Sequence, residues 1–215
     1  MSFNMNKKTK YYQYKNDIFY KLKFNFIKGK NILDIGCGDG SDLKIFTDEY
    51  KLKSYGIDIY KHKNINPIRH IHFKIGSIYK IPFRENCFDY IFLHDVLHHI
   101  DENKQSLENH IRALKELKRV IKKNGYIIII EGNRYNPLFY PHMVLMQGHN
   151  HWKQRYFIQT INTVFTKVRY KFFECHLYPA KFIYFWKLYE KLMETFSPKQ
   201  FLSYNCAIIK VEKKH

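Results

Sequence analysis

The sequence predicts an α/β fold, a doubly wound parallel sheet with helices on both faces. Two observations predict it: short apolar segments alternate with segments of helical spacing, and a glycine-rich loop directly follows the first apolar segment. A short apolar run bounded by glycine or polar residues is typical of a buried strand, and repeated alternation of strand and helix is typical of parallel sheets. The composition is 45% hydrophobic, which supplies enough apolar surface for a packed core.

The expected elements follow one another in a regular order. Aromatic residues and lysines alternate over residues 7–28, which predicts one or two N-terminal helices. Apolar residues at helical spacing predict helices over 41–49, with Ser41 as the N-cap, and over 103–122. The five strands expected in this part of the chain cover residues 31–36, 53–60, 71–77, 88–95 and 124–132.

After Gly132 the pattern changes. Residues 133–163, here called the lid, mix prolines, histidines and bulky apolar side chains and predict a lid or connector with short helices, which the resemblance described below implies is the variable substrate segment. Residues 165–179 and 204–213 predict two more strands, with a helix over 180–196 between them. This order of strand, helix and strand indicates that the same sheet continues to an edge.

The length of 215 residues suits one full-sized domain, so we expect a helical cap over 1–28 and a main domain over 29–215. The N-terminus lacks the apolar segment of a signal peptide, and the densest apolar run, 126–130, is far shorter than the roughly 20 residues that span a bilayer. Four scattered cysteines without a CxxC pair favour reduced thiols. These features predict a cytoplasmic protein.

The loop "NILDIGCGDGSD", residues 31–42, carries glycines at positions 36, 38 and 40. A dinucleotide-binding GxGxxG pattern that starts at Gly36 would need a third glycine at position 41, which is Ser41. A P-loop would need a lysine beside Gly40, and none is there. Three carboxylates surround the loop and would repel a phosphate, whereas they suit a ligand with a cationic amine or sulfonium; they are Asp34, Asp39 and Asp42.

Several segments resemble, in order and spacing, the class I S-adenosylmethionine-dependent methyltransferases of the small-molecule type. They are "ILDIGCGDG", Asp58 at the end of the second strand, "GSIYKIPFRENCFDYIFLHDVLHHI" and "ELKRVIKKNGYIIIIEGN", and they cover about residues 30–135. The resemblance implies a Rossmann-like, seven-stranded, mainly parallel sheet. It also implies S-adenosylmethionine as cofactor and S-adenosylhomocysteine as product.

The resemblance also implies which residues hold the cofactor. Asp58 would accept hydrogen bonds from both ribose hydroxyls, a task that suits the two oxygens of a carboxylate. Ser77 stands where the family often has an acidic residue beside the adenine. The full set of implied cofactor-binding residues is Asp34, Gly36, Cys37, Gly38, Asp58, Ile59, Ser77, Ile78 and His94. Tyr11 and Tyr12 are candidates to close over the cofactor, as N-terminal helices do in similar enzymes.

Methyl transfer requires a base only when the acceptor must lose a proton. The candidate catalytic residues are His99, His149 and His151, with His94 and His98 as further histidines near the end of the fourth strand. A metal site at His94 and His98 would need a third ligand, and the sequence offers no evident one. We therefore predict no metal site.

The net charge of +18 is concentrated outside the glycine-loop segment, in residues 1–30 and 151–215. It indicates an anionic partner, such as a membrane surface, a phosphorylated substrate or nucleic acid, or else it reflects only a lysine-rich composition. The apolar lid favours a small-molecule acceptor that is lipid-, quinone- or glycan-like, methylated at oxygen, nitrogen or carbon. "EGNRYNP", after the fifth strand, also resembles methyltransferases near lipid and glycan biosynthesis.

Two other functions stay open. The first is an RNA or protein methyltransferase, although the fourth strand does not end in the Asn/Asp-Pro-Pro-Tyr/Phe tetrapeptide that suits amino groups of bases or glutamine. The second is a non-catalytic binding module of the same fold. The helix over 180–196 also has two interpretations: its aromatic stripe packs on the sheet, or it binds a membrane surface together with Lys181, Lys187 and Lys191.

Overall fold

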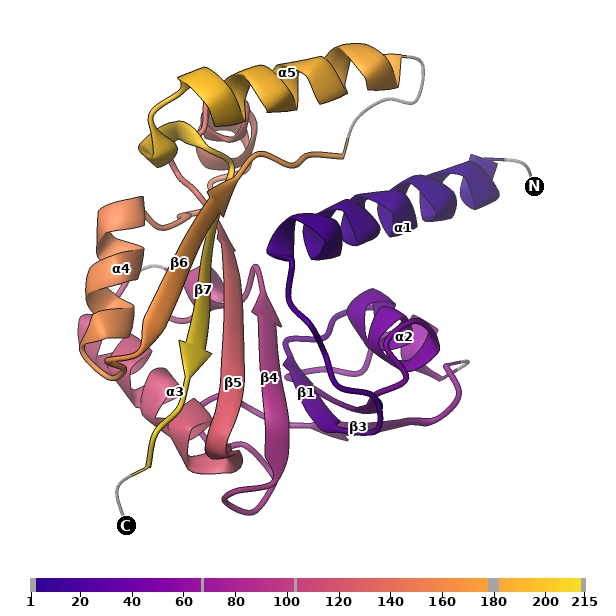
Figure 1. The fold of residues 1–215 in the computed structure, drawn as a ribbon, viewed down its shortest axis with the longest axis vertical. Coiled ribbons are helices and arrows are strands. Elements are labelled where there is room, and N and C mark those ends of the chain that lie inside the picture. The colour runs from indigo at the N-terminus through magenta and orange to yellow at the C-terminus, as the bar shows by residue number, and fades with distance from the viewer. Residues whose placement is uncertain (1–2, 67, 103, 178–181, 214–215) are drawn as a thin grey trace.

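The computed structural model describes residues 3–66, 68–102, 104–177 and 182–213. Its centre is a seven-stranded sheet with the order β3-β2-β1-β4-β5-β7-β6 (Figure 1). Strand β7 runs antiparallel to both β5 and β6, and the other neighbouring strands are parallel. The predicted mainly parallel sheet is therefore confirmed. The strands are β1 Asn31–Ile35, β2 Lys53–Asp58, β3 Ile71–Ile75, β4 Phe88–His94, β5 Ile121–Gly132, β6 Val168–Phe173 and β7 Tyr204–Lys210.

Helices cover both faces of the sheet. On one face, Phe19 of α1 and Phe46 of α2 pack against Phe92 of β4, with ring centroids 5.5 Å and 5.1 Å from Phe92. On the other face, Leu117 of α3 and Phe157 of α4 belong to a second buried cluster. Burial of these side chains holds the three layers together. The helices are α1 Phe3–Leu22, α2 Ser41–Asp48, α3 Leu107–Val120, α4 Gln154–Asn162 and α5 Ile183–Phe196.

The carboxyl ends of the parallel strands meet at one edge of the sheet. Asp34 pairs in register with Gly56 of β2 and Phe92 of β4, and His94 pairs with Ile130 of β5. In open α/β sheets ligands bind at this edge, where the strand order reverses. Here the order reverses between β1 and β4, so the glycine loop after β1 lies at the expected position.

Two local predictions were wrong. Ser41 is the first residue of α2 and does not cap it; the N-cap is Gly40, whose φ of 80° is left-handed. The Ser41 hydroxyl instead donates to Asp39 Oδ1 at 2.7 Å. Residues 23–28 are not helical either, because α1 is a single helix that ends at Leu22.

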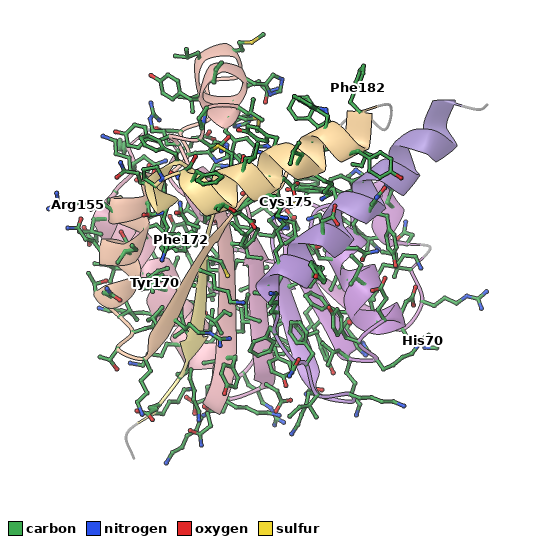
Figure 2. The ribbon with its side chains drawn as sticks, turned by 45° about the horizontal axis from the view of Figure 1, so that its top comes forward. His70, Arg155, Tyr170, Phe172, Cys175 and Phe182 are labelled. Carbon is green, nitrogen blue, oxygen red and sulfur yellow. The ribbon has the colours of Figure 1, made fainter. Side chains whose placement is uncertain are left out.

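The expected packing of the helix over 180–196 on the sheet was also wrong. Helix α5 lies beyond the carboxyl ends of the strands, beside α1 (Figure 1), and its one buried residue is Glu190. Both faces of the sheet are already covered by α1 to α4, so the aromatic stripe of α5 finds no sheet surface. Figure 2 shows Phe182 at the start of this helix, and Lys181 lies outside the described residues. The exposed large apolar side chains here are Phe182, Tyr184, Phe185, Leu188, Leu192 and Phe196.

Ion pairs connect α5 to α1. Lys21 of α1 contacts Glu190 at 3.0 Å and Glu194 at 2.7 Å, and Lys187 of α5 contacts Asp17 at 2.9 Å. Because Glu190 is buried, its two lysine partners compensate its charge. None of the helices in the described part of the chain is long and apolar enough to cross a membrane.

Candidate functional site

The glycine loop turns sharply at the end of β1. The Gly36 and Cys37 amides both donate to Ile57 O, and the Gly38 amide donates to Asp58 Oδ2 at 2.9 Å. Gly36 has φ of 67°, and a Cβ there would lie 2.7 Å from Val96 Cγ2. A Cβ on Gly38 would meet nothing within 4 Å. Gly36 therefore serves packing, whereas Gly38 leaves open space above the loop backbone.

Asp58, at the end of β2, connects the loop to the next strand. It is 8% exposed, and each of its two oxygens accepts one backbone amide, from Gly38 and Tyr60. Each carboxylate oxygen has two acceptor sites, so Asp58 keeps capacity for a diol. The neighbouring Ile59 is 75% exposed, which leaves an apolar surface beside this carboxylate.

The other residues expected around the cofactor differ in their exposure. Ser77 accepts the Tyr79 amide in a local turn at 3.2 Å, so its hydroxyl proton is left for another acceptor, and Ile78 is buried. Cys37 is buried against Gly56, and burial raises the pKa of its thiol. Cys37 therefore packs the loop and is not a reactive thiolate.

Lys15 is a site residue that sequence reasoning missed. It comes from α1, is 7% exposed, and its ammonium donates to Asp42 Oδ2 at 2.7 Å and to His94 Nδ1 at 2.9 Å. Since an ammonium group only donates, His94 Nδ1 accepts and the ring carries its proton on Nε2. Helical spacing alone does not distinguish Lys15 from the solvated lysines around it.

Charge interactions at this contact oppose burial. Burial favours neutral Lys15, but Asp42 and other nearby anionic groups raise its pKa. Burial likewise favours neutral Asp42, but the charge of Lys15 outweighs burial and lowers the pKa of Asp42 to about 2. Asp42, one of the three carboxylates predicted around the loop, therefore has its charge compensated by Lys15.

Asp34 differs from Asp42 in its hydrogen bonding and in the direction of its pKa shift. It is 2% exposed, and its Oδ2 is buried and has no hydrogen-bond partner within the described residues. Burial, followed by the charge of Asp42, raises the pKa of Asp34 well above its usual value. An unsatisfied buried carboxyl beside an open glycine backbone fits a ligand that carries an amine or a sulfonium. The residues present thus fit the cofactor implied by the sequence.

The aromatic residues of α1 divide between two places. Tyr11 lies near the site, with its ring centroid 5.4 Å from Lys15 Nζ. Tyr12 instead hydrogen-bonds to Glu49, which follows the last residue of α2, so it does not lie over the loop. The Tyr14 and Tyr204 hydroxyls contact each other, and Tyr204 donates to Asp95 at 3.3 Å.

Four histidines gather where β4 and the lid meet, and we call them the histidine cluster. The His98 ring lies 3.9 Å from that of His99 and 4.2 Å from that of His151. The His99 ring lies 5.5 Å from that of His149. The structure therefore brings together all three predicted catalytic candidates, and His98 with them, whereas His94 contacts Lys15 instead.

The four rings have different partners. His98 Nδ1 lies 2.7 Å from Glu131 Oε2; burial lowers the pKa of His98, but Glu131 outweighs this effect and raises it. Burial and then the charge of His98 lower the pKa of His151 to about 4. His99 and His149 share the carboxylate of Glu102, at 3.2 Å and 3.4 Å. Sequence reasoning missed Glu131, although its place after four isoleucines in β5 marks a buried carboxylate.

Two asparagines attach the lid to the segments that follow β6 and precede β7. Asn133 Nδ2 donates to Gln200 O and Leu202 O, and Asn136 Nδ2 donates to Glu174 at 3.0 Å and to Phe201 O at 2.9 Å. The "EGNRYNP" segment thus has a structural role. Beyond it the lid leaves large apolar side chains exposed, namely Leu138, Tyr140, Leu145 and Met146.

Comparison with known proteins agrees with this geometry. Residues 33–129 match a family model described as a methyltransferase domain. An uncharacterised methyltransferase of Schizosaccharomyces pombe is 31% identical over 149 residues, which cover 60% of this chain and 50% of the relative. A demethylmenaquinone methyltransferase of Geobacillus sp. is 28% identical over 123 residues, with coverages of 51% and 48%. The chain spans about half the length of these relatives.

The fold has a close structural counterpart. A crystal structure of a SAM-dependent methyltransferase from Archaeoglobus fulgidus superimposes with a TM-score of 0.68 at 16% identity, and covers 94% of both chains. Residues 33–129 therefore match a methyltransferase domain. The strand order and the overall fold are similar to those of a solved S-adenosylmethionine-dependent methyltransferase.

Proposed function

We propose that this protein transfers a methyl group from S-adenosylmethionine to a small-molecule acceptor and releases S-adenosylhomocysteine. The observation that carries the proposal is the hydrogen bond from the Gly38 amide to Asp58, beside open space at Gly38 and the unpartnered Asp34 oxygen. This edge of the sheet offers carboxylate acceptors and open backbone to one extended ligand.

The proposed roles follow the order of the strands. Asp58 accepts the ribose hydroxyls, and Ile59, Ser77 and Ile78 flank the adenine. Asp34, the glycine loop with Cys37, and His94 lie at the methionine end, where the Lys15 ammonium suits the carboxylate of that moiety. When bound, the cofactor supplies an activated methyl group on a sulfonium. The protein then has to align the acceptor and exclude water.

We propose the histidine cluster as the place where the acceptor is held. His99 and His149 both direct Nδ1 at Glu102, which leaves Nε2 of each ring as a candidate to receive an acceptor proton. His151 is the third candidate and is buried. A variant of His99 that lowers turnover but leaves cofactor affinity intact would support this assignment.

A lipid-, quinone- or glycan-like acceptor is favoured by the apolar residues of the lid and α5. Leu145 and Met146 of the lid are 66% and 77% exposed, and Tyr184 of α5 is 90% exposed. The similarity to a demethylmenaquinone methyltransferase points the same way. Together with the net charge of +18, these residues favour contact with an anionic membrane surface. Sedimentation with anionic vesicles, but not with neutral ones, is the expected result.

The cofactor proposal is tested by calorimetry with S-adenosylmethionine and S-adenosylhomocysteine. We expect micromolar binding by the wild type, and a loss of at least about tenfold in Asp58→Ala, because two charge-assisted hydrogen bonds disappear. Asp48→Ala is the matched control, since it removes an exposed carboxylate from α2. If the two variants bind alike, Asp58 does not hold the ribose, and if folded wild type binds neither ligand, the proposal fails.

An RNA acceptor is the second candidate, favoured by the basic excess in residues 1–30 and 151–215. Phosphate contacts would make RNA affinity fall steeply with salt. Filter binding over a salt series therefore separates this acceptor from a small molecule. A non-catalytic module would bind the cofactor yet transfer no label from it to any fraction of a cell extract.

A further inference from the structure

Three side chains at the carboxyl ends of β4 and β5 converge without being neighbours in sequence. They are Asp95, which follows β4, His98 in the short turn after it, and His151 in the lid. Each has one ligand-type atom within 4.8 Å of those of the other two. Two imidazoles and one carboxylate are a recurrent ligand set for divalent transition metals.

The His98 ring is held in the orientation that a metal ligand requires. Its Nδ1 lies 2.7 Å from Glu131 Oε2, and Glu131 Oε1 accepts the amides of Val96 and Leu97 at 2.9 Å and 2.6 Å. Glu131 is therefore anchored by two amides and accepts the Nδ1 proton of His98. A carboxylate behind a histidine is the usual support of a metal-bound imidazole, because it leaves the Nε2 lone pair for the ion.

His151 is otherwise unexplained. It is 5% exposed, and both ring nitrogens are buried without a hydrogen-bond partner within the described residues. Gly132 gives this ring its space, since a Cβ there would lie 2.8 Å from His151 Nδ1 and 3.4 Å from Asp95 Oδ1. A buried polar group without a hydrogen-bond partner destabilises the fold. The His151 ring fits here only because position 132 has no side chain, so we expect that a ligand binds its nitrogens.

Asp95 has capacity left for an ion. Its Oδ1 accepts the Gly132 amide at 2.8 Å, and its Oδ2 accepts the Tyr204 hydroxyl at 3.3 Å. Each oxygen keeps a second acceptor site. The donor atoms around zinc lie about 3.3 Å apart when the bonds are about 2.0 Å long. The ligand atoms lie within 4.8 Å of one another, so binding an ion requires each pair to approach by up to about 1.5 Å.

The adjacent set of His99, Glu102 and His149 lies equally close together but does not call for an ion. There the carboxylate of Glu102 already contacts both rings, and the three side chains are 47%, 34% and 35% exposed. Ordinary ion pairs and solvent satisfy these groups. The two sets therefore differ in their nitrogen atoms. Only the set with His151 has buried ring nitrogens without a hydrogen-bond partner among the described residues.

We propose that Asp95, His98 and His151 bind one divalent transition-metal ion, with zinc-type coordination. Asp95 also lies 3.6 Å from His94 Nε2, so the ion would sit directly beside the methionine end of the cofactor site. Three protein ligands leave at least one coordination position for another group. The open position would take an oxygen or nitrogen atom of an acceptor. With the ion bound, His151 serves as a metal ligand in place of the base role for which it is a candidate without the ion.

The test uses cobalt(II), whose visible absorption reports coordination, added to wild-type protein freed of metal by a chelator. We expect one equivalent to bind with low-coordinate visible bands, and zinc to displace it. Asp95→Asn and His151→Phe should weaken binding by at least about 100-fold, and Glu131→Gln by about 10- to 100-fold through loss of support to His98. His149→Ala is the matched control, because it removes a histidine of the neighbouring set.

Several results would overturn the proposal. They are the absence of saturable cobalt binding by folded wild type, and equal losses in His149→Ala and His151→Phe. If His151→Phe does not fold, Gly132→Ala keeps all three ligands and crowds the ring, and it must also weaken binding; normal cobalt binding by this variant counts against the site. No cofactor is added in these measurements, so their outcome is independent of the proposed methyl transfer.

Discussion

The contact between Lys15 and Asp42 gives a quantitative prediction for folding. Lys15→Met keeps most of the apolar stem of the side chain and removes the ammonium that contacts Asp42 at 2.7 Å. Both side chains are 8% exposed, so the carboxylate left behind cannot be solvated without disrupting α1. Removing one member of a buried ion pair costs about 3 to 5 kcal/mol. We expect a loss of that size in the free energy of unfolding at pH 7.

The pH dependence supplies a second estimate of the same interaction. The pKa of Asp42 is lowered from 3.8 to about 2 in the folded protein, which corresponds to about 2 kcal/mol of stability. For a lowered carboxyl pKa this stability is present above pH 3.8 and is lost as the pH falls towards 2. In Lys15→Met the sign reverses, because burial without the ammonium raises the pKa of Asp42 above its unfolded value. The variant should then recover part of its lost stability as the pH falls towards 3.8 and Asp42 takes up a proton.

The assay is urea unfolding followed by circular dichroism over a pH series. Lys44→Met is the matched control, since Lys44 pairs with Asp48 on the surface of α2, where such a pair contributes about 0.3 to 0.5 kcal/mol. The double variant Lys15→Met/Asp42→Asn should lose less than the sum of the single variants. Equal costs for Lys15→Met and Lys44→Met would refute the reasoning.

Three other variants test the site and the lid. Gly38→Ala should abolish most cofactor binding at a stability cost of about 1 kcal/mol, whereas Gly36→Ala should fold poorly. Calorimetry measures the binding and thermal unfolding measures the stability of each variant. Normal cofactor binding by Gly38→Ala would contradict the assignment of open backbone at Gly38. Asp34→Asn should raise the melting temperature at pH 7, because a carboxyl with a raised pKa destabilises the fold above pH 3.8, yet it should weaken cofactor binding; an unchanged affinity argues against its role. Asn136→Ala should cost about 1 to 3 kcal/mol by leaving Glu174 short of a buried donor, and an unaltered unfolding midpoint would show that this contact does not hold the lid.

Local patterns predicted much of the fold. The seven strands and the glycine loop follow from short-range features, because short apolar runs favour buried strands and glycine readily adopts the left-handed φ that the loop needs. Asp58 at the end of β2 was expected near the loop from the resemblance to the methyltransferase family, and its carboxylate accepts the Gly38 amide. The exception was α5, whose helical spacing was evident while the surface it would meet was not.

The sequence by itself determined the α/β sheet and the loop that marks a cofactor site, since both depend on residues that are neighbours along the chain. Only the tertiary structure decided which distant groups meet. It placed Lys15 of α1 between Asp42 and His94, and it brought His151 of the lid to His98 and Asp95. These contacts depend on how whole helices and loops pack against one another. The local spacing of residues along the chain does not show which polar side chain of a helix or loop will be buried.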